Sequence, residues 1–275
     1  MTGGWKPTEE AERVRVVLVH GVPETAAVWD RVAAGLGEPV VRLSPPGFGA
    51  PVPDGWGATV EEYRSWLVGE LEALGEPVHL VGHDFGAAHV VNVAMTRPDL
   101  LRTWAADVVG WFDPAYVWHP LAQVWQTPGD GEASVESLTS LDVPGRTELL
   151  VSFGIPRAVA EVLAPGCDAE LGRCVLGLYR SAAQPALSRL GEGLERAAAR
   201  PGLAILPTED GGVGDLAMRR RSAARAGAEV AVLDGVDHWW PLTAAEETVA
   251  VLRRFWAGRA DATHRSGTAH TLHGV

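Results

Sequence analysis

An aspartate occupies a position that is typical of a catalytic nucleophile. Residues 82–86 read GHDFG and follow directly after an apolar run at 78–81, which places Asp84 in the turn of a strand–turn–helix unit. Glycines on both sides give the steric room that so sharp a turn needs. A carboxylate there attacks carbon by displacement and forms an ester, and its ordinary pKa keeps it ionised without a base. The structural alternative is an aspartate that caps the following helix, which explains the carboxylate but not both glycines.

Hydrolysis of such an ester needs a base that activates water, and His238 is the candidate. It follows the last predicted strand, in the segment GVDHWWP at 235–241, and a neutral imidazole near its ordinary pKa suits the role. A packed loop histidine is the alternative. Asp210 is favoured as the carboxylate that orients this base, because the order nucleophile, acid, histidine then holds along the chain. Glu209 and Asp107 are its rivals.

The elements that carry these residues alternate between strands and helices. Helical spacing lies between strands and after the last one, at 25–36, 59–74, 87–95, 216–226 and 244–256. Short apolar runs predict buried strands at 14–19, 39–43, 78–81, 101–109, 203–206 and 229–233. This pattern predicts an α/β protein with a mostly parallel central sheet and helices on both faces. Parallel sheets bind ligands at the carboxyl ends of their strands, where Asp84, Asp210 and His238 all lie.

The alternation stops between residues 111 and 200, where the segments look helical and are broken by Pro and Gly. We therefore expect a helical cap at 111–200, inserted between a first part of the core at 1–110 and a second part at 201–257. Residues 258–275 are polar, rich in Gly, Thr and His, and aperiodic, which predicts a disordered tail.

The bulk composition limits the partners. Apolar residues make up 47% and charged residues 21% of the chain, as in soluble globular proteins. The formal charge of −12 disfavours nucleic acid and anionic membranes as partners. No run approaches the roughly 18 apolar residues of a membrane helix, and residues 1–7 lack the apolar part of a signal peptide. We expect a cytoplasmic monomer or homodimer, with Cys167 and Cys174 as buried or half-buried thiols.

Several motifs together resemble one known family. They are HGVP at 20–23, SPPGFG at 44–49, the Asp84 turn, WQTPGDGE at 125–132 and His238-Trp239. Over residues 14–257 the chain resembles the epoxide hydrolase and haloalkane dehalogenase branch of the α/β hydrolases, and it is closer to the epoxide hydrolases. The resemblance implies the α/β-hydrolase fold, a cap that closes over the turn, and an oxyanion hole formed by the backbone N–H groups of Val22 and Phe85. It implies no cofactor and no metal.

The cap residues bear on the choice of reaction. Epoxide opening needs an acid near the ring oxygen, and Tyr179 in LYRS at 178–181 resembles the segment that holds one such tyrosine in epoxide hydrolases. The second tyrosine of that family is missing from residues 121–124, which read LAQV. Its replacements remain open between four groups: Tyr116, His119, and the indole N–H of Trp118 or Trp125. These residues and Trp239 are expected to line an aromatic pocket.

The sequence thus predicts hydrolysis of a small apolar epoxide by water to a diol, through a covalent ester on Asp84. A haloalkane or haloacid dehalogenase with the same nucleophile is one alternative. Phe85 disfavours it, because a departing halide needs N–H donors and this side chain has none. A catalytically silent binding or biosynthetic-accessory protein is the other alternative, and the complete set of Asp84, Asp210 and His238 argues against it.

Overall fold

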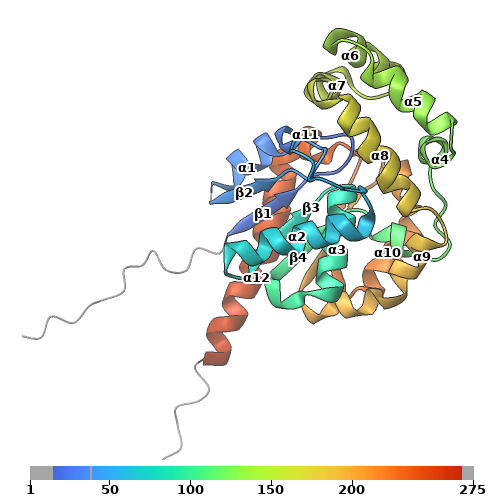
Figure 1. Ribbon diagram of the computed structural model, residues 1–275. Helices are drawn as coiled ribbons and strands as arrows, with labels where there is room; N and C mark the ends of the chain where they lie inside the picture. Colours follow the sequence, from blue (N-terminus) through green and yellow to red (C-terminus); the bar gives the residue numbers. More distant parts are fainter. Residues whose placement is uncertain (1–14, 38, 268–275) are drawn as a thin grey trace, which may run out of the picture.

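A parallel β-sheet forms the centre of the molecule. The computed structural model describes residues 15–37 and 39–267, and in this part of the chain the six strands all pair in parallel (Figure 1). Their order in the sheet is β2-β1-β3-β4-β5-β6. The strands are β1 (Val16–Val19), β2 (Val40–Leu43), β3 (Val78–Gly82), β4 (Leu101–Ala106), β5 (Gly202–Pro207) and β6 (Ala228–Leu233). The predicted parallel sheet and its strands are confirmed.

The chain adds β2 on one side of β1 and all later strands on the other side. The chain runs from β1 to β2 on one side, and then returns to place β3 on the other side of β1. Loops that leave two neighbouring strands in opposite directions open a crevice between them, and ligands bind at such switch points. The segment after β1 and the turn after β3 therefore meet at the same edge of the sheet.

Each face of the sheet is covered by helices, because alternate strand residues point to opposite faces. Val16 and Leu18 pack with α1 (Asp30–Leu36), α11 (Trp240–Thr243) and α12 (Ala245–Gly267). On the other face, Val17 and Val19 pack with helices of the second layer. These are α2 (Val60–Leu74), α3 (Phe85–Thr96) and α10 (Leu216–Arg225). The predicted start of α2 is confirmed by a capping box between Thr59 and Glu62.

Only helices connect β4 to β5. α4–α7 extend from one end of the molecule, and α8 runs back toward the sheet (Figure 1). The 3-10 segment η6 (Gly191–Ala199) instead packs against α3 beside the sheet. The connecting elements are η4 (Val109–Phe112), α4 (Pro120–Gln126), α5 (Asp130–Thr139), α6 (Val143–Ser152), α7 (Arg157–Leu163), η5 (Ala164–Gly166), α8 (Ala169–Ser181) and α9 (Ala186–Leu190).

Three boundaries differ from the sequence prediction. β4 ends at Ala106 rather than at 109, because the next residue, Asp107, turns its carboxylate toward the end of β3. The helix predicted at 25–36 is divided into η2 (Ala26–Trp29) and α1. The last helix, predicted at 244–256, continues as α12 to Gly267 and so includes part of the segment expected as a tail. Ala and Arg, which favour helices, recur through 257–262 and allow this extension. Residues 268–275 lie outside the described residues.

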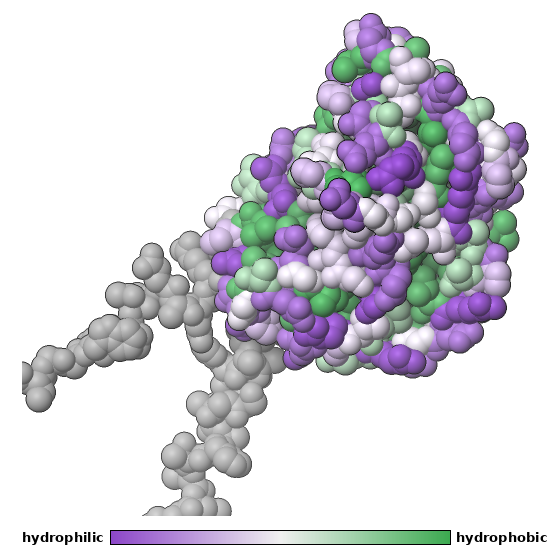
Figure 2. Space-filling view, viewed as in Figure 1, coloured by the Kyte–Doolittle hydropathy of each residue, from purple (hydrophilic) through white to green (hydrophobic). Residues whose placement is uncertain are grey.

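The surface carries both polar and apolar residues, as amphipathic helices around a folded core do. Polar and apolar residues are interspersed over the face seen in Figure 2. No helix among residues 15–37 and 39–267 is long and apolar enough to cross a membrane. Cys167 and Cys174 are buried and unpaired, as expected.

Candidate active site

Asp84 lies in a tight turn between β3 and α3. Its backbone has φ 52° and ψ −129°, a conformation that non-glycine residues rarely adopt outside functional sites. The two neighbouring glycines permit it. A Cβ at Gly82 would lie 2.4 Å from the Cα of Ala87, and a Cβ at Gly86 would lie 2.3 Å from the carbonyl oxygen of Val19. The residue therefore has the geometry of a nucleophile elbow and makes no side-chain capping bond to α3.

The Asp84 carboxylate lies at the switch point of the sheet. The backbone N–H of Val22, in the loop after β1, donates to its Oδ1 over 2.9 Å. The N–H of Phe85 also interacts with this carboxylate. Burial raises the pKa of Asp84 to about 6, although the positive charges of His238 and His83 oppose the shift. Both predicted oxyanion-hole groups therefore face the carboxylate that they are expected to serve.

His238 lies on the other side of that carboxylate and is held by Asp210. Its Nδ1 lies 2.8 Å from Oδ2 of Asp210, and its Nε2 lies 3.8 Å from Oδ2 of Asp84. Gly212 N–H donates to Oδ1 of Asp210 over 2.9 Å and fixes that side chain. Burial alone would lower the pKa of His238, but the charge and hydrogen bond of Asp210 raise it to about 9. The same contacts overcome burial at Asp210 and lower its pKa to about 2.

The two rival acids have different surroundings. Asp107 Oδ1 accepts the backbone N–H of Asp84 over 3.1 Å, and its Oδ2 lies 2.6 Å from Nδ1 of His83. It also accepts the indole N–H of Trp240 over 2.7 Å. Glu209 is exposed and makes no side-chain hydrogen bond within the described residues. Asp210 is therefore the carboxylate that the fold brings to the imidazole.

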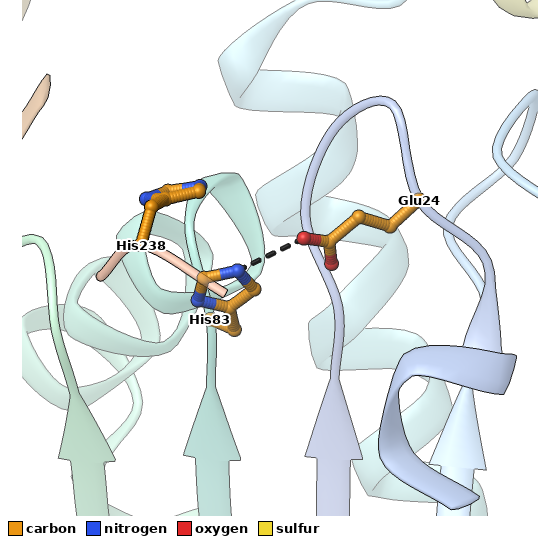
Figure 3. Close-up of side chains that lie close together, drawn as sticks. All are labelled: Glu24, His83 and His238. Carbon is orange, nitrogen blue, oxygen red and sulfur yellow. Dashed lines mark ion pairs between the residues drawn. The ribbon is translucent and has the colours of Figure 1, made fainter. Parts of the chain in front are cut away.

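Beneath the elbow lies a second set of charged groups. Nε2 of His83 lies 2.9 Å from Oε1 of Glu24, and the other ring nitrogen faces Asp107. All three side chains are fully buried. Figure 3 shows His83 between Glu24 and the His238 ring, just beyond the carboxyl ends of the strands. Glu24 and His83 are not among the predicted site residues, although Glu24 directly follows HGVP and His83 lies inside GHDFG.

These groups also form the one candidate metal cluster found within the described residues. Ligand atoms of Glu24, His83 and His238 lie within 4.8 Å of one another. A histidine binds a metal through a lone pair on a ring nitrogen. Nδ1 of His83 is hydrogen-bonded to Asp107 Oδ2, and the ion pair of its Nε2 with Glu24 Oε1 is a contact that a protonated ring makes. The arrangement fits an ion-paired imidazolium better than a metal ligand.

A cavity of about 400 Å³ opens above Asp84. Its walls come from the loops at the carboxyl ends of the strands and from α4, α5 and α8, with further apolar residues around α6 and α7. No lysine or arginine of the described residues lines it, whereas Asp84, Glu209, Asp210 and Asp237 do. The walls are therefore mostly apolar, and their acidic side chains outnumber the charged imidazole of His238.

The predicted pocket residues divide into two groups. Tyr179, His119, Trp125 and Trp239 line the cavity, together with Trp111. The predicted lining position is wrong for two residues, Tyr116 and Trp118, which are buried behind the wall. The reason is that each turns its polar group to a backbone carbonyl. The Tyr116 hydroxyl donates to Gly212 over 2.6 Å, and the Trp118 indole donates to Ala182 over 3.0 Å.

Three donors remain at the cavity. No hydrogen bond of the described residues engages the Tyr179 hydroxyl, whose ring packs on Phe85 and Trp125 at 4.8 Å and 4.7 Å. Burial and the charge of Asp84 raise the pKa of Tyr179 well above its ordinary value, so the phenol stays protonated. Nδ1 of His119 accepts the backbone N–H of Ala122 over 3.2 Å. In the neutral ring the proton therefore resides on Nε2. The Trp125 indole is the third donor.

One family model matches this chain, and its curated relatives are named for different activities. The alpha/beta hydrolase family model matches residues 16–251. Curated relatives include lipase LipV of Mycobacterium tuberculosis (35% identical over 88 residues, 31% of this chain and 33% of the relative). Others are (E)-2-((N-methylformamido)methylene)succinate hydrolase of Acinetobacter baylyi (30% over 100 residues, 35% and 38%) and an epoxide hydrolase of Caballeronia sordidicola (35% over 102 residues, 34% and 31%). The chain thus matches only about a third of each relative's length.

Solved structures with the same fold cover almost the whole chain. A loop variant of a haloalkane dehalogenase from Bradyrhizobium elkanii has a TM-score of 0.71 at 16% identity and covers 93% of each chain. An epoxide hydrolase from Vigna radiata has a TM-score of 0.70 at 19% identity and covers 90% of this chain and 92% of its own. At such identities the likeness shows the fold alone. Because the family match spans most of the sheet and its helices, this chain belongs to the alpha/beta hydrolase family.

Proposed function

We propose that this hydrolase converts an epoxide to a diol through a covalent ester on Asp84. One observation carries the proposal: a carboxylate occupies the nucleophile position of the elbow, with the Val22 N–H on Oδ1 and the His238 imidazole near Oδ2. A carboxylate cannot act as the hydroxyl of a serine hydrolase does, but it can displace a leaving group at carbon. The names of the epoxide hydrolase relative and structural neighbour support the same reaction.

Ring opening is the first step. Oδ2 of Asp84 attacks one epoxide carbon, and the bond between that carbon and the ring oxygen breaks. The ring oxygen takes the proton of the Tyr179 hydroxyl, which faces the same cavity. Oδ1 then becomes the carbonyl oxygen of the ester. The Val22 N–H already donates to it, so little reorganisation is needed.

Ester hydrolysis is the second step. His238 takes a proton from water, and the hydroxide attacks the ester carbonyl carbon. The N–H groups of Val22 and Phe85 stabilise the oxyanion. When the acyl–oxygen bond breaks, the diol oxygen takes the proton from His238. Asp84 emerges as a carboxylic acid, whose proton returns to the Tyr179 phenolate. Asp210 holds the His238 ring in the orientation that this exchange needs.

A second donor to the epoxide oxygen comes from the cap, for which we propose residues 111–200. Tyr116 and Trp118 are excluded because their donors bind backbone carbonyls. His119 and Trp125 remain, and both line the cavity. The Nε2–H tautomer of His119 favours this residue, because the Ala122 N–H occupies its other nitrogen and fixes the ring.

The cavity favours an uncharged, apolar substrate. Four carboxylates and no lysine or arginine line it within the described residues, so a carboxylate substrate would meet repulsion that the protonated His238 offsets only in part. The hydrolase of a succinate derivative in Acinetobacter baylyi acts, by its name, on a different kind of molecule. We propose a neutral epoxide whose apolar part lies against α5 and α8.

Dehalogenation is a second candidate because one observation favours it. The Trp125 indole lines the cavity and makes no hydrogen bond within the part of the chain that the structure describes, so it offers an N–H donor to a halide. The other nearby indole, that of Trp111, donates to the carbonyl of Gly212 over 3.2 Å. A single indole is a weak halide site, and a Tyr phenol beside the nucleophile suits an alkoxide better.

A single turnover in heavy-oxygen water tests the ester mechanism. The heavy oxygen enters Asp84 first and reaches the diol only in later turnovers. A first-turnover diol that already carries the label would exclude the covalent ester. In the His238→Gln variant the ester should accumulate and add the mass of the epoxide to the protein. Parallel assays with haloalkanes decide between the candidates, because halide release without epoxide turnover would favour dehalogenation.

A further inference from the structure

A buried ion-paired network connects the two loops that form the oxyanion hole. Glu24 Oε2 accepts the backbone N–H of Gly21 over 2.9 Å, directly before the donor residue Val22. Asp107 Oδ1 accepts the backbone N–H of Asp84 over 3.1 Å. His83 lies between the two carboxylates. Its Nδ1 is hydrogen-bonded to Asp107 Oδ2 over 2.6 Å, and its Nε2 forms an ion pair with Glu24 Oε1 over 2.9 Å, outside hydrogen-bond geometry. The loop after β1 and the elbow after β3 are thus held through one imidazole.

The contacts of His83 require a charged ring. Two carboxylates that face both ring nitrogens need a proton on each nitrogen, and only the imidazolium has both. Burial alone would lower the pKa of His83, but Glu24 and Asp107 raise it well above the ordinary value. A neutral ring would leave two buried negative charges without compensation, which is costly in a dry interior. The charged ring is therefore the state that fits its surroundings.

We propose that His83 is a positioning residue, a buried imidazolium that fixes the position of the Val22 N–H relative to the Asp84 carboxylate. In its kinetic part this inference rests on the proposed function. The residue does not line the cavity in which we propose that the substrate binds. It acts through Glu24 on the Gly21–Val22 segment and through Asp107 on the backbone of Asp84.

The same charge acts on the catalytic base. The rings of His83 and His238 have centroids 4.7 Å apart, so each positive charge opposes the other. The remaining groups that act on His238 are Asp210 and Asp84, which favour its protonated form, and His119, which is neutral by burial. Once Asp84 is esterified it loses its charge, while His83 keeps its own. The imidazolium then promotes the neutral form of His238 when a base is needed.

The charge state of His83 can be measured without any substrate. In full-length protein labelled with nitrogen-15 at histidine, both His83 ring nitrogens should carry protons at pH 8, and both signals should vanish in His83→Gln. The pKa of His238, followed by its ring shifts, should rise in that variant because a positive charge is removed. A neutral His83 ring at pH 8, or a His238 pKa that does not move, overturns the proposal.

Kinetics test the positioning role. We expect His83→Gln to lower kcat roughly 10-fold to 100-fold, because a misplaced donor or nucleophile costs about that much, and to shift the acid limb of the pH profile upward. If His83→Gln alone does not fold, the double variant His83→Gln with Glu24→Gln replaces it in the assay, because it lacks one of the two carboxylate charges that the single variant leaves uncompensated. His89→Gln is the matched control, since His89, in α3, is as buried as His83 but has no carboxylate partner. A folded His83→Gln enzyme with the kcat and pH profile of the control overturns the proposal.

Failure of the proposed function can be told apart from failure of this inference. Wild-type protein that turns over no epoxide contradicts the proposed function, while the spectroscopic result still decides the charge state of His83.

Discussion

The buried layer beneath the elbow and the cavity above it differ in whether their polar groups are already paired. Beneath Asp84, the polar groups of Glu24, His83 and Asp107 are fully buried and face one another closely. Above it, the donors of Tyr179, His119 and Trp125 face an apolar cavity and leave capacity for a ligand. A site that must hold its reacting atoms still needs the first kind of surroundings, and one that must accept a substrate needs the second. The comparison implies that the lower layer fixes the chemistry and the cavity selects the molecule.

Replacement of the nucleophile should cause the largest loss of kcat. Asp84→Asn should lower kcat by about 10⁴-fold or more, because an amide cannot form the ester and a catalytic set acts as a unit. The amide oxygen can still accept the Val22 N–H, so the fold should persist. Steady-state turnover with an epoxide, together with the mass of the protein after incubation, measures the effect. Turnover near the wild-type rate would remove Asp84 from its proposed role.

Two adjacent acids give the next test. Asp210→Asn should lower kcat by roughly 10³-fold to 10⁴-fold, since an amide neither fixes the imidazole tautomer nor stabilises its positive charge. Glu209→Gln, one residue earlier on the same loop, should change kcat far less, because its carboxylate makes no contact with His238. Equal losses in both variants would contradict the pairing.

A pair of tyrosines tests the cavity. Tyr179→Phe should lower kcat by about 100-fold, because a positioned general acid contributes at least that much. In Tyr116→Phe the lost hydroxyl bonds only the carbonyl of Gly212, so the effect on kcat should be at least tenfold smaller. The two variants remove the same atom at similar burial and differ in whether the ring lines the cavity. A larger loss from Tyr116→Phe would reverse the assignment of the proton donor.

The sequence predicts the lower layer well where the signal is local. GHDFG places Asp84, and the apolar runs place the strands, because these features depend on neighbouring residues. The link of Glu24 with His83 and Asp107 escapes such patterns, since three strands that are distant in the chain must first lie side by side. In the cap, Tyr116 and Trp118 resemble pocket residues by type. Their hydrogen bonds to Gly212 and Ala182, more than 60 residues away, turn them from the cavity.

The pH dependence of kcat/KM depends on Asp84 at the elbow and on Tyr179 in the cavity. Burial raises the pKa of Asp84 to about 6, and only the ionised form attacks. kcat/KM should therefore fall roughly tenfold for each pH unit below that value and level off above it. The high pKa of Tyr179 keeps the phenol protonated, so it should add no loss at neutral pH. A pH profile of kcat/KM from pH 4 to 8 measures this, and an acid limb centred near pH 4 would show that burial does not control the nucleophile.

The smallest effect should come from the outer wall of the cavity. Phe153 is 55% exposed yet lines the cavity, whereas Val117 is 73% exposed and does not. Phe153→Ser should raise KM by about fivefold for a long apolar epoxide, since loss of one partly buried apolar contact costs on the order of 1 kcal/mol. Val117→Ser should leave KM unchanged, and neither variant should alter kcat or the pH profile. If kcat rather than KM changes in Phe153→Ser, substrate selection and chemistry are not divided between the cavity and the lower layer. If KM changes only for long substrates, the apolar part of the substrate extends from Asp84 to the outer wall.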